Sequence, residues 1–282
     1  MIENPATCNK IFNCAGKTLD LSTPAVMGIL NITDDSFFDG GSYVTTDAQL
    51  RQAEKMVGDG ASIIDIGAVS TRPGIKVSSE EEEKKRLIPA LKSLISHFPD
   101  VIFSIDTFRT EIASATFNEG AGMINDIYGG TYDSGMIPFV VSRNLPYILM
   151  HMQGTPENMQ AHPVYNNVIE DIMNFFREQL KKFPENFHQV ILDPGFGFGK
   201  TVEHNYTILA GLNRFQELGY PVLSALSRKT MINKVLGTTP AEALNGTTVL
   251  NTISLLKGAS LLRVHDVREA MDAVRLVAML NN

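Results

Sequence analysis

The chain has 282 residues, of which 44% are hydrophobic and 20% charged, as expected of a globular protein. Its formal net charge of -7 argues against a nucleic-acid partner, which would need clustered Lys and Arg. No apolar run approaches the ~18 residues of a membrane span, and the first twenty residues lack the apolar core of a secretory signal. The two cysteines, Cys8 and Cys14, lie near the N-terminus. We therefore expect a cytoplasmic protein with reduced thiols and no membrane partner.

Eight short runs rich in Val, Ile and Leu predict β-strands. They cover residues 26–31, 63–67, 101–106, 123–127, 147–151, 190–193, 222–226 and 261–265. The segments between them carry apolar residues at helical spacing, up to a last helix with Met271, Val274, Leu276, Val277 and Leu280. Eight strand–helix alternations predict one α/β domain over residues 1–282, a closed (β/α)8 barrel of the TIM type. Residues 1–25 precede it, and we expect a short N-terminal hairpin there that plugs the barrel floor.

Local signals mark where helices begin and end. Thr46 to Gln49 has the pattern of a capping box, and Ser79 before four glutamates predicts a second capped helix start. Gly60, Gly120 and Gly258 each open the same six-residue pattern of a glycine, two small residues, two strand apolars and one polar side chain. We expect these glycines to end helices in a left-handed conformation and the strands that follow to be parallel.

Polar residues follow every predicted strand. A lone Asp or Asn at such a place commonly caps the next helix, but eight groups in succession at the carboxyl ends of barrel strands indicate one site. Carboxylate and amide oxygens suit a planar ring bearing N–H groups, whereas cationic side chains suit a phosphorylated group. The acceptors are Asp106, Asn125 and Asp193; the actual or potential cations are Arg72, Lys229, Arg263 and His265; the aromatic rings are Phe37, Phe108 and Phe198. The pattern predicts a site for a polar heteroaromatic with a phosphate-bearing tail.

Two other site types fit less well. Gly195 to Thr201 is similar to a phosphate-binding P-loop, but three residues rather than the required four separate Gly195 from Gly199. We expect these glycines to let the backbone approach a flat ligand. The histidines lack the spacing to Cys or Glu that a zinc site needs.

Motifs along nearly the whole chain resemble those of the dihydropteroate synthase family, pterin-binding TIM-barrel enzymes of folate biosynthesis. They are ILNITDDSFFDGG (29–41), STRPG (70–74), SIDT (104–107), NDI (125–127), LMHMQG (149–154), LDPGFGFGK (192–200), SRKTMI (227–232) and RVHDV (263–267). The resemblance implies a transferase, often a homodimer, and a target of sulfonamides. The reaction it implies joins 6-hydroxymethyl-7,8-dihydropterin diphosphate to 4-aminobenzoate and releases diphosphate.

The resemblance also implies roles for individual residues. Pterin diphosphate would be bound by Asn31, Thr71, Asp106, Asn125, Met150, Asp193, Phe198, Lys229, Arg263 and His265. The 4-aminobenzoate pocket would be bordered by Phe37, Pro73 and Thr230. Asp39, Arg72 and Lys229 would take part in catalysis, and Asn31 would help to ligate Mg²⁺ on the diphosphate.

The chemistry of these groups fits a dissociative substitution. The amino-pyrimidine edge of a pterin presents adjacent N–H donors that a carboxylate such as Asp193 can accept. Positive charge develops on the pterin methylene as diphosphate leaves, so we expect Mg²⁺ together with Arg72, Arg263 and His265 to stabilise the departing anion. The amine of 4-aminobenzoate is unprotonated at neutral pH, and no strong general base is needed.

The sequence departs from the family pattern around the expected aminobenzoate pocket. Asp34 replaces a usual proline, Phe38 a common serine, Ala68-Val69 a frequent glycine and glutamate, and Thr230 a common serine. We expect a more mobile first loop and an altered sensitivity to sulfonamides. Two alternatives stay open: a methyltransferase barrel of the methyltetrahydrofolate–corrinoid type, and a pterin-binding homologue without catalysis. Diphosphate release that depends on 4-aminobenzoate would separate all three.

Overall fold

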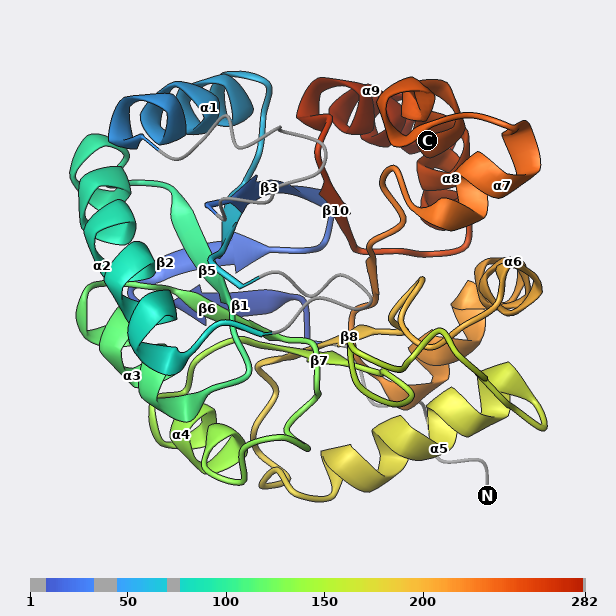
Figure 1. Cartoon of the computed structure of the whole chain (residues 1–282), viewed down its shortest axis with the longest axis horizontal. Helices are drawn as coiled ribbons and strands as arrows, with labels where there is room; N and C mark the ends of the chain where they lie inside the picture. The colour runs from blue at the N-terminus through green and yellow to red at the C-terminus, as the bar shows by residue number, and fades with distance from the viewer. Residues whose placement is uncertain (1–8, 33–44, 70–76, 281–282) are drawn as a thin grey trace.

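The computed structural model describes residues 9–32, 45–69 and 77–280. Eight parallel strands form one sheet in the order β8-β7-β6-β5-β4-β3-β10-β9. A parallel bridge between Leu192 and Val222 links its two edges, so the ring is nearly closed (Figure 1). The strands are β3 (Ala25–Asn31), β4 (Ile63–Gly67), β5 (Ile102–Asp106), β6 (Met123–Asp126), β7 (Tyr147–Met150), β8 (Val190–Asp193), β9 (Leu223–Ser224) and β10 (Leu261–Val264). The predicted (β/α)8 barrel is confirmed.

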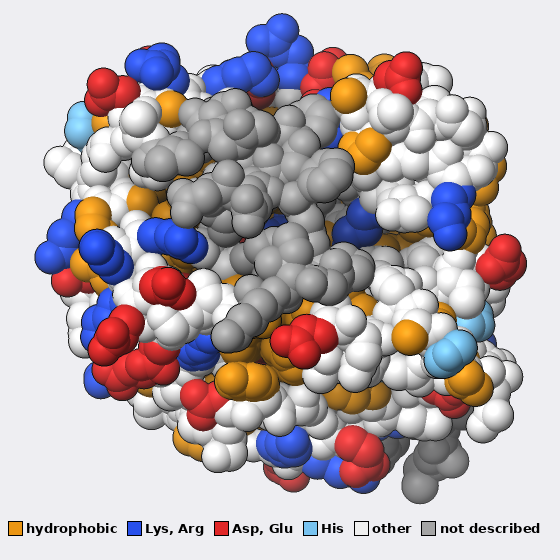
Figure 2. Space-filling model, viewed as in Figure 1, with side chains coloured by type: hydrophobic (Ala, Val, Ile, Leu, Met, Phe, Trp, Pro, Cys, Tyr) orange, Lys and Arg blue, Asp and Glu red, His pale blue; other side chains and the backbone are white. Residues whose placement is uncertain are grey.

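Helices surround the ring on its outside (Figure 1). They are α1 (Thr46–Gly58), α2 (Glu80–His97), α3 (Thr110–Asn118), α4 (Met136–Ser142), α5 (Val168–Leu180), α6 (Val202–Ala210), α7 (Thr230–Leu236), α8 (Leu244–Leu256) and α9 (Val267–Ala278). Two short 3-10 helices, η1 (Leu212–Leu218) and η2 (Pro240–Glu242), join them. None of the helices in the described ranges combines the length and apolar character needed to cross a bilayer. On the face in Figure 2, acidic and basic side chains are interspersed around the edge.

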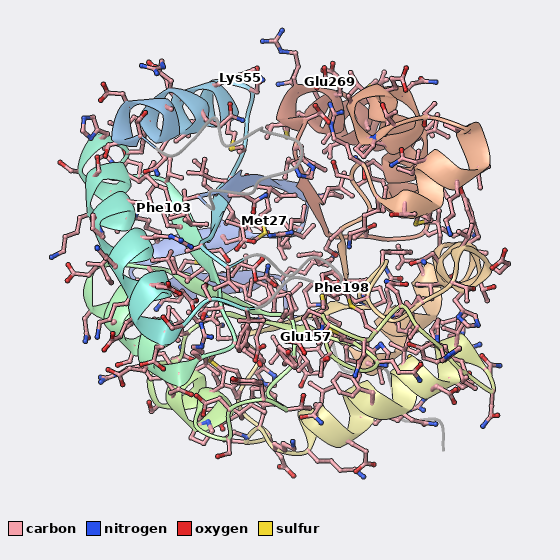
Figure 3. All side chains as sticks on the ribbon, viewed as in Figure 1. Met27, Lys55, Phe103, Glu157, Phe198 and Glu269 are labelled. Carbon is pink, nitrogen blue, oxygen red and sulfur yellow. The ribbon has the colours of Figure 1, made fainter. Side chains whose placement is uncertain are left out.

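Side chains alternate between two apolar cores because successive strand residues point to opposite faces. Ile64 and Phe103 pack in the outer core, between strands and helices, whereas Met27 and Ile63 belong to an inner core. Met27 accordingly lies near the centre of the ring and Lys55 at its outer edge (Figure 3). The inward positions therefore form layers along the barrel, and the last layer before the carboxyl ends is the one that carries polar residues.

An antiparallel hairpin of β1 (Ile11–Cys14) and β2 (Lys17–Asp20) precedes the barrel. Its buried side chains, Phe12, Cys14 and Leu19, pack in the inner core with residues from the amino-terminal parts of the strands. The hairpin thus covers the amino end of the barrel and leaves the carboxyl end for a site. Cys14 is buried and unpaired, and burial raises its pKa to about 12, so it is an inert thiol.

The helix signals were mostly right. Ser79 caps α2 in a reciprocal capping box with Glu82, as predicted. The N-cap of α1 is Thr45 rather than Thr46, because the Thr45 hydroxyl accepts from the Ala48 amide, so the Thr46 capping box was wrong. Gly60, Gly120 and Gly258 have positive φ angles of +104°, +104° and +87°, as their shared pattern predicted.

Five strands are shorter than their apolar runs, and two of these, Ile102–Asp106 and Leu261–Val264, lose only one terminal residue. The run 222–226 forms only Leu223–Ser224, since Val222 makes the isolated bridge that closes the ring. The strand from Met123 ends at Asp126, whose carboxylate turns the chain by accepting from the amides of Tyr128 at 2.8 Å and Gly130 at 2.9 Å. The strand from Tyr147 ends at Met150, one residue before its predicted end.

Candidate active site

Polar strand-end residues form one layer at the carboxyl end of the barrel. The strand register aligns Asn31 with Gly67, Gly67 with Asp106, and Asp106 with Asn125. Gly67 leaves room between its neighbours, since a Cβ there would lie 3.3 Å from Asn31 Oδ1 and 3.8 Å from Asp106 Oδ2. The predicted convergence of these residues on one rim is confirmed.

Arg263 joins two carboxylates across this rim. Its Nε donates to Asp65 Oδ2 at 2.7 Å and its Nη2 donates to Asp106 Oδ2 at 2.9 Å. Asn125 Nδ2 donates to the same Asp65 oxygen at 2.9 Å, so the amide oxygen of Asn125 is the atom left to receive a ligand donor. The arginine is therefore held in place before any ligand arrives.

Asp65 was not among the predicted site residues. It is fully buried, one layer below the rim, and its other oxygen, Oδ1, has no hydrogen-bond partner among the described residues. The repeated six-residue pattern contained the signal, because its polar positions are Asp65, Asn125 and Arg263, which bond to one another.

Burial and neighbouring charges set the pKa values of this cluster. Burial raises the pKa of Asp106 to about 7, although the Arg263 guanidinium opposes the rise; the nearby Asp65 adds to it. Burial lowers the pKa of Arg263, but Asp65 and Asp106 outweigh it and the pKa is raised. Arg263 is thus a permanent cation, and Asp106 is a carboxylate poised near neutrality.

A second cluster lies beside the glycine-rich loop that follows β8. Lys229 Nζ donates to the carbonyl of Phe196 and lies 4.8 Å from the centre of the Phe198 ring. Burial lowers the pKa of Lys229 to about 8, against the effect of Asp193. Burial likewise raises the pKa of Asp193, and Lys229 opposes the rise. An acid at the end of β8, Asp193, and an amine from the segment after β9, Lys229, therefore lie in one environment beside this loop.

Between the two clusters lies an apolar wall. Met150, Phe108 and Ile127 are buried together, and Phe198 and Tyr128 pack against them. Met150 and Phe198 thus line a common surface, as the resemblance implied. Phe108, expected as a free aromatic face, instead packs edge-on against Tyr128 at 4.9 Å and is part of the rim itself.

The last two strand ends are tied to each other. His265 Nδ1 lies 3.0 Å from Ser227 Oγ, and burial, with Arg263 nearby, lowers the pKa of His265 to about 4. The imidazole is neutral at pH 7, so it can offer an N–H but no charge. Arg228 has a φ of +57° and forms a two-point ion pair with Asp266 at 2.8 and 2.7 Å. Arg228 therefore supports the two loops.

The remaining predicted residues divide into two groups. Thr230 is exposed at the first position of α7, directly after Lys229. Five predicted site residues and two family departures lie outside the described residues: Phe37, Asp39, Thr71, Arg72, Pro73, Asp34 and Phe38. Their roles stay predictions.

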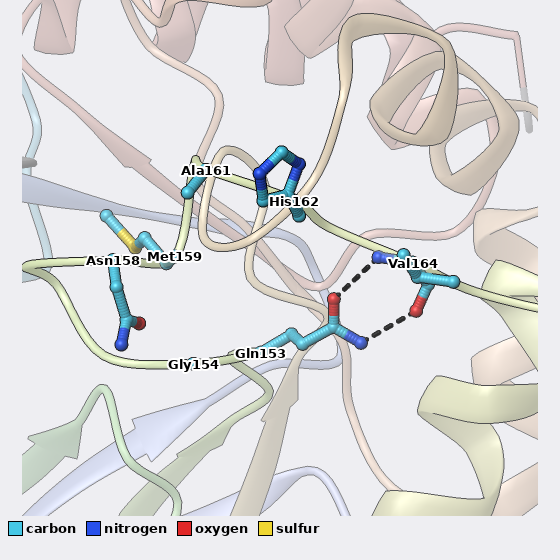
Figure 4. A pocket seen from close by; sticks show the side chains of 7 residues that line it. All are labelled: Gln153, Gly154, Asn158, Met159, Ala161, His162 and Val164. Carbon is cyan, nitrogen blue, oxygen red and sulfur yellow. Dashed lines mark hydrogen bonds between the residues drawn. The ribbon is translucent and has the colours of Figure 1, made fainter.

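A separate hollow of about 320 Å³ lies in the loop between β7 and α5 (Figure 4). Its lining residues are Gln153, Gly154, Asn158, Met159, Ala161, His162 and Val164, none of which was predicted for the site. The Gln153 amide spans it with two hydrogen bonds to the Val164 backbone, at 2.8 and 2.9 Å. This hollow is a feature of the loop's own folding and contains no charged side chain that would hold an anion.

Comparison with known proteins agrees with this geometry. Residues 27–265 match the family model described as pterin binding enzyme. The chain is 41% identical over 265 residues to the dihydropteroate synthase of Escherichia coli strain K12, covering 93% of each chain. The chain belongs to the dihydropteroate synthase family.

Solved structures of this family have the same fold. A Yersinia pestis dihydropteroate synthase in a sulfonamide drug complex superposes with a TM-score of 0.91 at 39% identity, covering 96% of this chain and 99% of that one. A Xanthomonas albilineans dihydropteroate synthase with 4-aminobenzoic acid gives a TM-score of 0.88 at 36% identity, with 96% and 98% covered. The family and the fold are thus shown, and the binding roles of Asp106, Asn125, Asp193, Lys229 and Arg263 stay predictions.

Proposed function

We propose that this enzyme condenses 6-hydroxymethyl-7,8-dihydropterin diphosphate with 4-aminobenzoate to give 7,8-dihydropteroate and diphosphate. The observation that carries the proposal is the meeting of three acceptors, the buried Asn125 and Asp193 and the partly buried Asp106, beside the Met150–Phe198 wall and the cations Lys229 and Arg263. A flat ring with N–H groups on its edge and an anionic tail matches this combination of wall, acceptors and cations.

Pterin recognition follows from the directions of the polar groups. The Asp193 carboxylate accepts one backbone hydrogen bond, from Gly195 at 2.7 Å, and retains acceptor capacity for the ring edge. Asn125 has its amino group engaged by Asp65 and therefore offers its oxygen. Both groups accept rather than donate, so they favour the amino-pyrimidine edge of a pterin over a ring edge made of acceptors.

Departure of diphosphate is assisted by groups on the β10 side of the rim. Arg263 supplies positive charge, and His265 next to it is a neutral imidazole. Charge developing on the leaving oxygen gains more from such fixed donors in a buried site than from bulk water. The amine of 4-aminobenzoate then attacks the methylene carbon and loses its proton to solvent.

Magnesium fits the donors that the rim provides. Within the described residues no three His, Cys, Asp or Glu side chains gather as a metal cage, but Mg²⁺ commonly binds through one or two protein oxygens together with substrate phosphates and water. Asn31, whose Oδ1 is directed toward Gly67 in the rim layer, would hold it. When bound, the ion would neutralise charge on the diphosphate and polarise its bond to carbon.

The test is a coupled diphosphate-release assay with and without 4-aminobenzoate. We expect release from pterin diphosphate only when 4-aminobenzoate is present, and loss of most activity in Asp193→Asn with little effect of the exposed Asp272→Asn. Tight pterin-diphosphate binding with no release would instead support the non-catalytic homologue. Methyl transfer from a methylated pterin without diphosphate release would support the methyltransferase barrel.

We also propose that the enzyme is a homodimer that works in the cytoplasm. Leu276 and Leu280 were expected to help form the last helix's apolar face, yet they are 71% and 72% exposed, and Met279 between them is also exposed. Exposed apolar side chains on α7 and α8 extend this surface: Val235, Leu236, Val249 and Leu256. Exposed apolar side chains on helices that pack against one another are typical of a subunit interface.

Light scattering after gel filtration tests the dimer. We expect wild-type enzyme at twice the mass of one chain and Leu276→Arg as a monomer. Val164→Glu is the control, because Val164 is 71% exposed on the loop between β7 and α5 and lies outside this surface. A wild-type monomer at micromolar concentration, or a dimer in Leu276→Arg, contradicts the assignment of the interface.

A further inference from the structure

The lysine that ends the glycine-rich run after β8 lies inside the protein. Lys200 is only 3% exposed, so it does not resemble the phosphate-binding lysine of a P-loop in its accessibility. Its Nζ has three acceptors: His151 Nδ1 at 3.0 Å, the Phe198 carbonyl at 2.9 Å and the His151 carbonyl at 3.3 Å. An ammonium has three N–H groups, so each of them is matched by one acceptor.

This contact is one of a series along the loop. Four successive carbonyls, from residue 196 to residue 199, each accept a hydrogen bond from a side chain. The pairs are Phe196 with Lys229, Gly197 with Gln160, Phe198 with Lys200, and Gly199 with the Tyr165 hydroxyl. The donors come from three different segments, and Lys200 is the most deeply buried of them. A loop with three glycines has little intrinsic rigidity, so its shape depends most on its buried, charge-assisted contact, which is the one from Lys200.

Lys200 also connects the loop to the strand beside it. It bonds to the carbonyl and the ring of His151, and the His151 amide donates to the Asp193 carbonyl at 3.0 Å. The Gly195 amide, at the start of the same loop, donates to the Asp193 carboxylate. Lys200 therefore links the two backbone segments on either side of Asp193. It also holds the carbonyl of Phe198, whose ring lies under Lys229.

We propose that Lys200 is a positioning residue of the pterin site, which fixes the Phe198 ring and the Asp193 carboxylate by tying the loop after β8 to the end of β7. This inference rests on the proposed function, since it concerns the same ligand. Lys200 itself does not touch the pterin.

The charge of Lys200 gives the inference a measurable signature. The cations that face Asp193 are Lys229 from the loop after β9, Arg263 from β10 and Lys200; all three lower its pKa, while burial raises it. His151, at the end of β7, is neutral because burial and Lys200 hold its pKa well below the usual value. Burial holds the pKa of Lys200 well below its usual value and Lys229 adds to this, whereas Asp193 opposes the fall, so the ammonium is favoured as the pH is lowered. Without Lys200, the Asp193 carboxylate takes up a proton at a higher pH.

Calorimetric binding of 6-hydroxymethyl-7,8-dihydropterin tests the proposal, because this probe has no phosphate that titrates near neutrality. We expect Lys200→Met to weaken binding at neutral pH by about tenfold or more, and to move the acidic loss of binding upward by about half a pH unit. Tyr165→Phe is the matched control, since it removes one contact to the same loop and no charge. It should bind within about twofold of wild type and keep the wild-type pH profile.

The outcomes separate this inference from the proposed function. A wild-type enzyme that fails to bind the pterin overturns both, whereas Lys200→Met with wild-type affinity and pH profile overturns only the role of Lys200. Should Lys200→Met not fold, Lys200→Arg carries the test, because it keeps the charge but cannot place the same three N–H groups. We expect Lys200→Arg to bind the pterin more weakly but to lose binding at the same acidic pH as wild type. Wild-type affinity in Lys200→Arg contradicts the proposal.

Discussion

Asp65 contacts two side chains of the predicted pterin diphosphate site, Arg263 and Asn125, from below the rim. One of its oxygens accepts from both Arg263 and Asn125, so the carboxylate fixes the direction of a cation and of an amide together. Asp65→Asn keeps the shape of the side chain, but its amide oxygen is an uncharged acceptor for both donors. Charge-assisted hydrogen bonds contribute about 1.5–3 kcal/mol, so we expect kcat/KM for pterin diphosphate to fall by about tenfold or more.

Steady-state kinetics with each substrate varied in turn measures this effect. The KM for 4-aminobenzoate should change by no more than about twofold, since Asp65 contacts Asn125 and Arg263, which are predicted to bind pterin diphosphate. Asp272→Asn provides the comparison, because its carboxylate is exposed and lies 3.7 Å from Arg275 in a surface pair of little energetic value. Equal kinetics for the two variants would show that Asp65 does not orient the site.

The lowered pKa of Lys229 predicts that activity falls at alkaline pH. Burial lowers its pKa to about 8, so the amine of the free enzyme is charged below that pH and neutral above it. If its charge assists pterin diphosphate, kcat/KM for this substrate is retained below about pH 8 and falls as the pH rises through it. In Lys229→Arg the cation persists, and we expect the alkaline limb to move above about pH 9 at a lower plateau. A wild-type profile that stays flat through pH 9 excludes Lys229 as the group responsible.

At the scale of elements, one glycine of the repeated pattern, Gly60, and the nearby helical Gly58 give a paired test of stability. Gly60 has a φ of +104°, and a Cβ there would lie 3.1 Å from Met271 Cγ, whereas Gly58 ends α1 with nothing within 4 Å of such a Cβ. We expect Gly60→Ala to lower the free energy of unfolding by about 1–2 kcal/mol. Gly58→Ala should raise it by about 0.5–1 kcal/mol, because alanine restricts the unfolded chain. Urea denaturation measures both, and equal effects of the two changes would contradict this account.

The elements were predictable from sequence where local chemistry determines them. The Ser79 cap, the left-handed glycines and the order of parallel strands all depend on residues close to one another in the chain. The length of β9 depends instead on its neighbours: Val222 bridges to Leu192 of β8. Local patterns also could not distinguish Thr45 from Thr46 as the cap, since both side chains can accept the same kind of bond.

The candidate site likewise has features that local sequence determines and features that depend on distant neighbours. Its acceptors and cations could be identified because they directly follow strands, and barrel topology brings strand ends together. Their pairing could not, because Arg263 and Asp65 are 198 residues apart and only the register of the closed sheet makes them neighbours. The neutrality of His265 was also hidden, since it results from burial and from the positive charge of Arg263.

At the scale of the whole molecule, the apolar packing of the hairpin and the polar layer of the candidate site lie at opposite ends of the barrel axis. The N-terminal hairpin covers one end, where Phe12 is fully buried among inner-core residues such as Met27 and Ile63, while the polar layer lies at the other end. A change at the hairpin should therefore affect folding without affecting turnover. Phe12→Ala removes a buried aromatic ring and should lower the free energy of unfolding by about 3–5 kcal/mol.

Ile11→Ala is the matched change on the same strand, since Ile11 is 49% exposed. This substitution should lower the free energy of unfolding by less than about 1 kcal/mol. Denaturant titration gives the two free energies, and kcat and KM are measured well below the melting temperature of each variant. We expect both variants to keep kcat and both KM values within about twofold of wild type, because no described contact connects Phe12 with the rim. A fall in kcat for folded Phe12→Ala would show instead that packing at the floor controls the geometry of the site.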